Sequence, residues 1–292
     1  MKTLDPSQLS ARAFYAYLNS AVAPRPIAFA STVDAAGRVN LSPFSFFNVM
    51  GIDPPILVFA PNRRGRDNTA KHTSLNLLEV PELVINMVSY AMVEQMSLTS
   101  AEFERGVDEF VKAGFTAVAS ERVRPPRVGE SPAQFECQVL EIKTIGSMEL
   151  VIAEVILAHF SEEILDENGR IDQHRTDWVA RLGGDWYARA SGAALFEVPR
   201  PQMGVGVDAL PEAVRTSRIL TGNDLGRLGS VLEVPTRAEI ERFRQTPAMM
   251  ALHEEARLGC QYLPDLLHLH AQKLLARGQV HEAWLTLLQS TL

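Results

Sequence analysis

Apolar and polar residues alternate over several short stretches in the first two thirds of the chain, a pattern typical of β-strands with one buried face. It predicts strands at residues 27–33, 39–48, 56–60, 83–88, 133–144 and 149–159. Between them, at 70–78, 91–96 and 107–113, apolar residues recur every three or four positions, which predicts short helices. We therefore expect a mainly β fold of the α+β class, crossed by short helices.

The first two predicted strands form a β-hairpin, because the apolar run 27–33 ends in a turn where Gly37 can adopt positive φ. The second strand, 39–48, is unusual because it presents hydroxyl, amide and aromatic groups on both faces. Such a strand suits a planar, polar-edged heterocycle that carries a phosphate. A β-sandwich strand with a buried phenylalanine cluster is the alternative. The residues concerned are Ser42, Phe44, Ser45, Phe46, Phe47 and Asn48.

The pattern changes near residue 199, where a connector rich in proline and glycine begins and strand-like alternation stops. Beyond it, helices are predicted at 237–244, 247–258, 266–277 and 280–289, the first opened by a capping box at Thr236 and Glu239. We place a first domain at residues 1–200 and a helical C-terminal extension at 201–292. The glycine-rich segment 220–229 is predicted to be a structured loop, since it lacks the spacing of a phosphate-binding loop.

Composition excludes several classes of function. The chain has 35 acidic and 28 basic residues and a net charge of −7, so no overall positive field attracts nucleic acid or an anionic membrane. Two cysteines and no secretory or membrane-spanning pattern lead us to expect a cytoplasmic protein without disulfides. The seven histidines show no metal-ligand spacing, and no nucleophile pair is recognisable.

A series of motifs spread in order over residues 10–200 resembles the flavin reductase-like family. The resemblance rests on Arg25-Pro26-Ile27, Ser31-Thr32, the run from Asn40 to Asn48, Lys71-His72-Thr73, Asp108-Glu109-Phe110, Glu136-Cys137, His159 and Arg181-Leu182-Gly183-Gly184. It implies an FMN-binding split β-barrel of the flavoredoxin or NAD(P)H:flavin oxidoreductase type. His72 stands where the family usually has aspartate, and it either accepts a backbone bond or adds positive charge near the phosphate.

Candidate site residues follow from residue type and from the resemblance. Hydroxyl and cationic groups suited to a flavin phosphate come from Ser31, Thr32, Arg63, Lys71 and Thr73, whereas Arg64 and Arg66 are interpreted as solvated loop residues. By resemblance, Ser45, Phe46, Phe47 and Asn48 line the flavin ring, and His159 lies near the flavin and nicotinamide as the candidate catalytic residue. The alternative for His159 is a strand-end histidine bonded to the backbone. Arg181 either binds substrate or phosphate or forms an ion pair.

The resemblance implies an enzyme that passes hydride from NADH or NADPH to FMN, with FAD as another flavin that could be used. The final acceptor is left open between free flavin, a partner monooxygenase and a nitroaromatic or quinone-like molecule. A non-enzymatic electron carrier of the flavoredoxin kind is the contrasting hypothesis. The resemblance also implies a homodimer with FMN near its interface, and the 220–229 segment is a candidate lid over the flavin.

Overall fold

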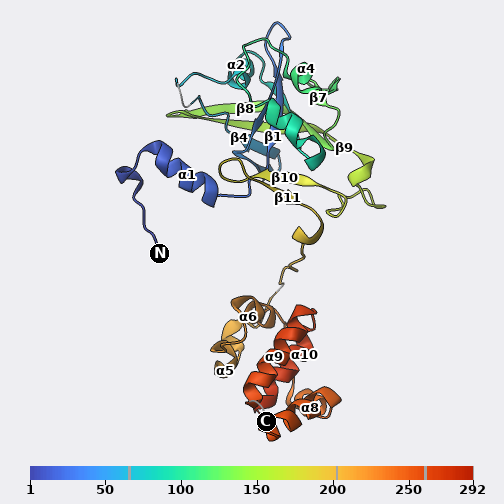
Figure 1. Ribbon diagram of the computed structural model, residues 1–292. Coiled ribbons are helices and arrows are strands. Elements are labelled where there is room, and N and C mark those ends of the chain that lie inside the picture. The colour runs from blue at the N-terminus through green and yellow to red at the C-terminus, as the bar shows by residue number, and fades with distance from the viewer. Residues whose placement is uncertain (65–66, 202, 260–261, 292) are drawn as a thin grey trace. The chain divides into compact units, whose positions relative to one another are not determined.

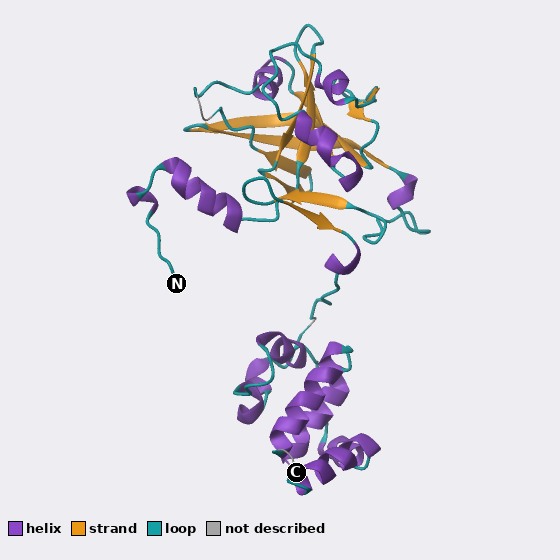
Figure 2. Cartoon of the chain, in the orientation of Figure 1, coloured by secondary structure: helices purple, strands orange, loops and turns teal. Residues whose placement is uncertain are grey.

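The computed structural model describes residues 1–64, 67–201, 203–259 and 262–291, and the chain forms two compact units, Met1–Phe196 and Glu197–Leu292. Strands are confined to the first unit, and the second is helical (Figures 1 and 2). The break between the units falls in the segment just before the proline- and glycine-rich connector. Among the described residues, no helix is long and apolar enough to span a bilayer.

The first unit is built on one antiparallel sheet of seven strands in the order β2-β1-β5-β8-β9-β4-β3. Two smaller ladders, β6 with β7 and β10 with β11, lie outside it. The strands are β1 Ala28–Val33, β2 Val39–Phe44, β3 Phe47–Ile52, β4 Pro55–Phe59, β5 Glu82–Asn86, β6 Ala117–Val118, β7 Arg127–Val128, β8 Ala133–Ile145, β9 Met148–Phe160, β10 Trp178–Arg181 and β11 Tyr187–Ala190.

The predicted hairpin of the first two strands is present, with Val33 opposite Val39 in the register of β1 and β2. The prediction of one strand over 39–48 is wrong, because the chain leaves the sheet at Ser45 and Phe46 and re-enters it as β3. β2 and β3 form the two opposite edges of the sheet, yet Phe44 and Phe47 are only three residues apart and so within roughly 10 Å. The sheet therefore curls back on itself and stays open at this one seam, which we call the split.

Side chains alternate across β1 and divide the interior into two apolar clusters. Ala28 and Ala30 pack with Phe59 and Leu77 on one side, whereas Phe29 packs with residues such as Met96 and Phe110 on the other. Helix α2 (His72–Glu79) contributes Leu77 to the first cluster. Helices α3 (Val93–Leu98) and α4 (Glu109–Ala113) cover the second cluster. Helix α1 (Ala11–Ala21) has no buried residue in this chain.

The second unit has its own core, in which Trp284 is 1% exposed and donates its indole N–H to the carbonyl of Leu228. The 220–229 segment is not a loop as predicted, because Thr221 and Asp224 form a capping box that starts a helix there. The helices are α5 Glu212–Arg215, α6 Gly222–Gly229, α7 Arg237–Arg244, α8 Pro247–Arg257, α9 Leu263–Ala276 and α10 Val280–Leu287. Short 3-10 helices occupy Pro6–Gln8, Tyr90–Met92, Glu162–Ile164, Gly192–Ala194, Val207–Ala209 and Leu288–Thr291.

Candidate functional site

A cavity of about 850 Å³ lies beside the split and has a mainly apolar lining. Ser45 and Phe46, the residues that interrupt the sheet, form part of its wall, and Ala60 donates its amide to the carbonyl of Phe46. Its volume lies in the range of pockets that enclose a drug-sized molecule. The lining comprises Ala21, Val22, Ala23, Pro24, Arg25, Pro26, Ser45, Phe46, Phe47, Asn48, Met50, Val58, Ala60, Asn62, Met148 and Leu150.

Two polar side chains in this apolar wall carry buried atoms without a hydrogen-bond partner in the protein, Nε of Arg25 and Oδ1 of Asn62. Arg25 is 6% exposed, and the rest of its guanidinium donates to the carbonyls of Asn19, Val22 and Leu182. Burial lowers the pKa of Arg25 from its ordinary value. Both atoms are inaccessible to solvent, so a ligand in the cavity could pair with them only after a shift of the surrounding wall, and such groups are costly to leave unpaired.

Aromatic contacts hold the split in place. The Phe46 ring meets the edge of the Tyr15 ring at 6.2 Å between centroids, and the Arg25 guanidinium lies 5.7 Å from the Phe46 centroid. Phe47 pairs with Phe59 at the start of β3. Phe46 is thus the link between helix α1, the buried arginine and the cavity.

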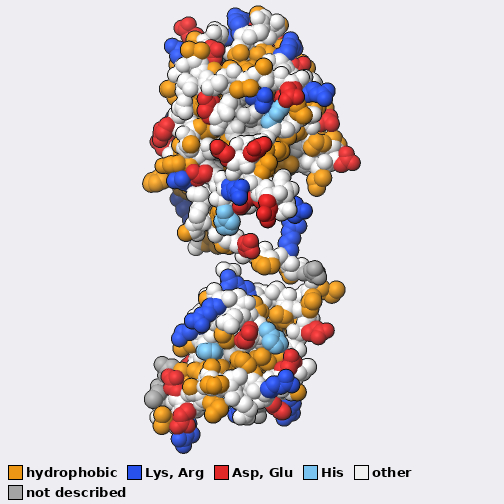
Figure 3. All heavy atoms as spheres, turned by 90° about the vertical axis from the view of Figure 1, so that its right-hand side faces the viewer, with side chains coloured by type: hydrophobic (Ala, Val, Ile, Leu, Met, Phe, Trp, Pro, Cys, Tyr) orange, Lys and Arg blue, Asp and Glu red, His pale blue; other side chains and the backbone are white. Residues whose placement is uncertain are grey.

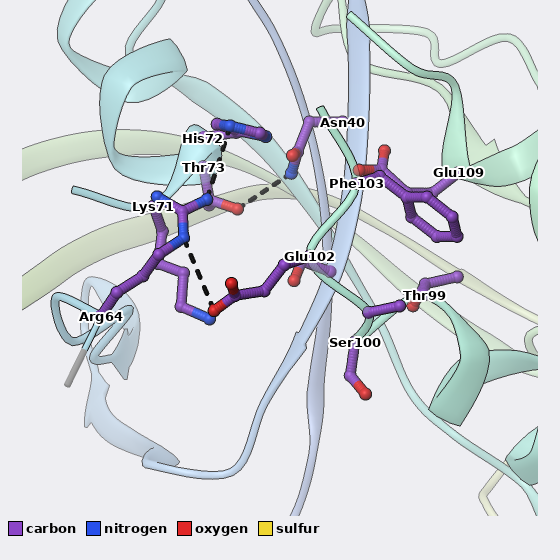
Figure 4. Close-up of a pocket in the computed structure, with 12 residues that line it drawn as sticks. Asn40, Arg64, Lys71, His72, Thr73, Thr99, Ser100, Glu102, Phe103 and Glu109 are labelled. Atoms are coloured by element: carbon purple, nitrogen blue, oxygen red, sulfur yellow. Dashed lines mark hydrogen bonds and ion pairs between the residues drawn. The ribbon is translucent and has the colours of Figure 1, made fainter. Parts of the chain in front are cut away.

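A second cavity, of about 30 Å³, is polar and lies at the N-terminus of α2 (Figure 4). Two cationic side chains, Arg64 and Lys71, face two carboxylates, Glu102 and Glu109, across it. Among the described residues, no side chain caps the start of α2, so the amides of its first turn are available to an anion. The other lining residues are Asn40, Ser42, His72, Thr73, Thr99, Ser100, Ala101 and Phe103.

Arg64 is oriented by several bonds before any ligand binds. Its guanidinium donates to Thr69 Oγ1 at 3.2 Å and to the carbonyl of Ala70 at 2.6 Å, and Nη2 lies 3.4 Å from Nε2 of His72. Because arginine can only donate, Nε2 of His72 is the acceptor and its proton sits on Nδ1. Burial first, and then the charges of Arg64, Arg105 and Lys71, lower the pKa of His72. His72 is therefore neutral near pH 7 and adds no positive charge, and the donor that its ring nitrogen meets is Arg64 and not the backbone amide that the sequence had led us to expect.

The remaining titratable groups of the polar cavity are also perturbed. Burial and the Arg64 charge lower the pKa of Lys71, whereas Glu102 opposes this shift. Burial raises the pKa of Glu109, whose Oε2 accepts the backbone amide of Leu41 at 3.0 Å. Perturbed ionisable groups gathered in a concave site are a mark of functional sites.

The two cavities are lined in part by the same stretch of chain, because Ser42 lines the polar cavity and Ser45 the apolar one. Three residues span at most roughly 10 Å. The site thus combines an apolar bed with unused polar atoms and, close by, a cationic cluster at a helix N-terminus. This combination fits a planar heterocycle linked to a phosphate group.

Several predicted residues lie in this site, namely Ser45, Phe46, Phe47 and Asn48 at the apolar cavity and Lys71 and Thr73 at the polar one. Ser31 and Thr32 do not, since both are fully buried in β1. Ser31 donates to the carbonyl of Pro126, and Thr32 accepts from Asn76. Ser31 has thereby used its hydroxyl hydrogen, and Thr32, although it only accepts, is 0% exposed and lines neither cavity among the described residues, which alternation along the strand could not reveal.

The structure reverses the predictions for Arg63, which was expected to bind phosphate, and for Arg64, which was expected to be a solvated loop residue. Arg63 forms an ion pair with Glu149 at 3.0 Å and does not line either cavity among the described residues. Arg64 is not a solvated loop residue, because its side chain is only 14% exposed and lies in the polar cavity. The prediction for Arg66 lies outside the described residues.

His159 and Arg181 likewise lie apart from the two described cavities. Nε2 of His159 is 2.8 Å from Oε1 of Glu136, a fully buried carboxylate. Burial alone would raise the pKa of Glu136, but bonds from His159 and from the amides of Glu121 and Arg122 lower it overall. Arg181 exchanges backbone hydrogen bonds with Arg25 and stacks on Tyr187 at 4.5 Å. His159 thus contacts a side-chain carboxylate and not the backbone, as the alternative had stated, and the ion pair of Arg181 is a long one, 3.8 Å to the exposed Asp185.

Sequence reasoning missed Arg25, Asn40, Asn62 and Glu109 as site residues. Arg25 and Asn40 were recognised only as parts of family-like motifs, and Asn62 carries no local signal. Asn62 lines the apolar cavity because the loop after β4 folds against the split. Only the folded chain shows this arrangement.

On the face drawn in Figure 3, acidic and basic side chains are intermixed over each unit. Within the described part of the chain, no group of three or more histidine, cysteine, aspartate or glutamate side chains could hold a metal ion.

The sheet, open at the split and with an apolar cavity beside it, has the architecture of split-barrel proteins. Comparison with known proteins agrees, because the model of the flavin reductase like domain matches residues 20–175. The chain belongs to this family. An uncharacterised protein of Aquifex aeolicus is 39% identical over 177 residues, which cover 61% of this chain and 90% of that protein.

Solved structures place the first unit in the same class. The 2-nitrobenzoate 2-nitroreductase of Pseudomonas fluorescens is 30% identical with a TM-score of 0.60, covering 68% of this chain and 96% of that one. Nitrilotriacetate monooxygenase component B of Bacillus cereus is 27% identical with a TM-score of 0.64, covering 68% and 98%. The first unit is therefore a flavin reductase-like fold with flavin-dependent oxidoreductases as neighbours.

Proposed function

We propose that this protein is an FMN-dependent oxidoreductase that takes hydride from NADH or NADPH and passes the electrons to free flavin or another acceptor. The observation that carries the proposal is the pairing of the apolar cavity, with its unused donor and acceptor, and the cationic cavity at the start of α2. The two features fit the two parts of one phosphorylated flavin.

The apolar cavity would hold the ring system. Phe46 and Phe47 supply flat apolar surface, while Nε of Arg25 and Oδ1 of Asn62, which are buried behind the cavity surface, would donate to a ring acceptor and accept from a ring N–H after a shift of the wall. The polar edge of an isoalloxazine ring has both kinds of group. Binding would thus satisfy two buried atoms that lack partners within the protein.

The polar cavity would hold the phosphate. Arg64 and Lys71 supply positive charge, the first turn of α2 supplies amides, and Thr73 supplies a hydroxyl. Charge-assisted hydrogen bonds to an anion are roughly twice as strong as neutral ones. The neutral His72 keeps Arg64 oriented by accepting from it. FMN and FAD have in common the phosphate next to the ribityl chain, and they differ only in the part of the molecule beyond that phosphate.

A bound flavin supplies the redox chemistry, accepting hydride from a nicotinamide and returning electrons to an acceptor. The protein's own residues place the ring, exclude water from one face of it and anchor the phosphate. No side-chain nucleophile is required for this function. The buried Cys137 is unsuited to such a role, because desolvation raises the pKa of its thiol.

We further propose that two copies of the chain pair along β3, which would place the flavin near the interface. β3 is an edge strand, and Val49, Met50 and Ile52 on it are 63%, 67% and 96% exposed. Unpaired edges with apolar side chains are prone to associate. Met50 also lines the apolar cavity, so a second copy seated here would complete its wall.

The size of the apolar cavity favours a second candidate, a reductase of a nitroaromatic or quinone-like molecule that binds beside the ring. The similarity to a 2-nitrobenzoate reductase supports this candidate. The similarity to a monooxygenase component B supports free reduced flavin, delivered to a partner monooxygenase, as the product. Both candidates use the same flavin site.

Asn62→Ala tests the ring site. Removal of the unused acceptor should weaken binding of FMN and of riboflavin equally, by on the order of 1–3 kcal/mol, because both share the ring. Fluorescence titration of the flavin-free protein measures both affinities. Unchanged affinity for both flavins would contradict the placement of the ring in this cavity. Asn168→Ala, an exposed asparagine in the turn after Asp166 and outside the cavity, is the control.

A further inference from the structure

The loop that follows β4 contributes side chains to both cavities of the candidate site. Ala60 and Asn62 line the apolar cavity, and Arg64, two residues further on, lines the polar one. One short stretch of chain therefore meets both parts of a ligand whose ring lies in the first cavity and whose phosphate lies in the second. Two linked groups bind together only when their sites are correctly spaced, so the placement of this loop matters for the whole site.

Arg63 lies between these residues and connects the loop to the hairpin of β8 and β9. Its backbone amide donates to the carbonyl of Ser147 at 3.1 Å, in the turn of that hairpin. Its guanidinium Nε donates to Oε1 of Glu149 at 3.0 Å, near the start of β9. The two strand neighbours of Glu149, Met148 and Leu150, line the apolar cavity. Arg63 thus ties the loop to a strand that itself forms part of the ring site.

Glu149 is a carboxylate in an otherwise apolar row. Every second residue at the start of β9 is buried, and the next two in this row are Val151 and Ala153. The Glu149 side chain is 7% exposed, and that of Arg63 is 35% exposed. Oε2 of Glu149 has no hydrogen-bond partner among the described residues, so the carboxylate depends on its bond to Arg63. Because a buried charge is costly without its partner, this ion pair holds Arg63 more firmly than an exposed pair would.

We propose that the ion pair of Arg63 and Glu149 positions the loop, so that Asn62 and Arg64 meet the ring and the phosphate of one flavin together. This inference rests on the proposed function, because it takes a phosphorylated flavin as the ligand of both cavities. Arg63 and Glu149 line neither cavity among the described residues, so they act as positioning residues and not as ligand contacts. The pair thereby sets how strongly the protein prefers FMN to riboflavin, which lacks the phosphate.

The test compares the full-length wild-type protein with Glu149→Met, which keeps the length of the side chain and removes its charge and its acceptor. Flavin-free protein is titrated with FMN and with riboflavin, and the ratio of the two Kd values gives the preference for FMN. We expect this preference to fall about three- to tenfold, because the two ends of FMN no longer bind together. Charge alone predicts the opposite, since loss of a carboxylate beside a cationic loop favours an anion. An unchanged or increased preference would therefore overturn the proposal.

Three further variants separate positioning from a general effect of the substitution. Glu82→Met is the matched control, because it removes the same charge from an ion pair of the first unit, with Arg124 at 3.3 Å, that lies outside both cavities. It should keep the wild-type preference, and an equal fall would contradict a specific role of Glu149. Arg63→Lys, which can still donate to Glu149, should retain most of the preference. The double variant Arg63→Met and Glu149→Met leaves neither charge unpaired, so it should fold even if Glu149→Met does not, and it should show the same fall.

The outcomes also distinguish failure of this inference from failure of the proposed site. If the wild-type protein prefers FMN and the double variant keeps that preference, the phosphate site stands and the positioning role is wrong. If the wild-type protein binds FMN and riboflavin equally, the polar cavity is not a phosphate site and both proposals fall. If Glu149→Met weakens binding of both flavins to the same extent, the ion pair supports the fold in general, and the positioning role is again wrong.

Discussion

Thr73 illustrates how a single residue connects the sheet, a helix and the candidate phosphate site. Its side chain is 1% exposed in the first turn of α2, and its Oγ1 accepts a hydrogen bond from Asn40 Nδ2 at 3.0 Å. The hydroxyl hydrogen is left to donate, and Thr73 lines the polar cavity. Asn40 in turn lies on β2 next to Leu41, which Glu109 holds in place.

Thr73→Ala should weaken FMN binding by on the order of 1–3 kcal/mol, because one donor to the phosphate is lost. Riboflavin binding should not change, which is the opposite of the result expected for Asn62→Ala. Parallel titrations with the two flavins measure the difference, and Thr73→Ser, which retains the hydroxyl, should restore most of the FMN affinity. An equal loss for both flavins would show that Thr73 acts by supporting the fold.

At single residues, sequence reasoning reached the right segments more often than the right side chains. Residue type indicated that hydroxyl groups on β1 could bind phosphate, but Ser31 and Thr32 face inward and are bonded to Pro126 and Asn76. Likewise the arginine-rich loop was recognised, yet which of its members enters the cavity depends on tertiary ion pairs such as Arg63 with Glu149. Long-range partners of this kind leave no local signature.

Among the elements, β2 and β3 decide where the site lies. Alternation over 39–48 predicts a strand but cannot show that the strand stops at Ser45. The local signal is Pro43, two residues earlier, since proline within such a run is typical of an edge strand. The break results from the curl of the sheet, which brings both edges to one seam. By contrast, the hairpin was predictable, because Gly37 and the flanking apolar runs specify it locally.

The exposed edge strand β3 gives a prediction at this scale. Ile52→Lys places a charge on the proposed dimer edge, and we expect it to convert a dimer into a monomer, since charged side chains block edge-to-edge pairing. Light scattering coupled to size-exclusion chromatography measures the mass. Val111→Lys on α4, where the side chain is 77% exposed, is the matched control. A wild-type protein that is monomeric at all concentrations would contradict the proposed pairing.

At the scale of the whole molecule, the chain consists of two units. The first contains the residues that match the known family, and the second is helical and lies outside that match. The family match ends at residue 175, and the second unit has its own core around Trp284. Sequence composition indicated this division through the proline- and glycine-rich connector. It could not indicate the helix at 222–229, since glycines dominate that stretch and the capping box of Thr221 and Asp224 is what starts it. The lid role suggested for this segment stays a prediction.

The central claim is that a flavin bound to the first unit accepts hydride directly from a nicotinamide. The most direct test is the visible spectrum of the full-length protein loaded with FMN, followed anaerobically after addition of NADH and, separately, NADPH. We predict that one of the two bleaches the oxidised flavin bands within seconds. Flavin that stays oxidised with both nicotinamides, but is bleached by dithionite, would contradict the claim and identify the protein as an electron carrier reduced by a protein partner.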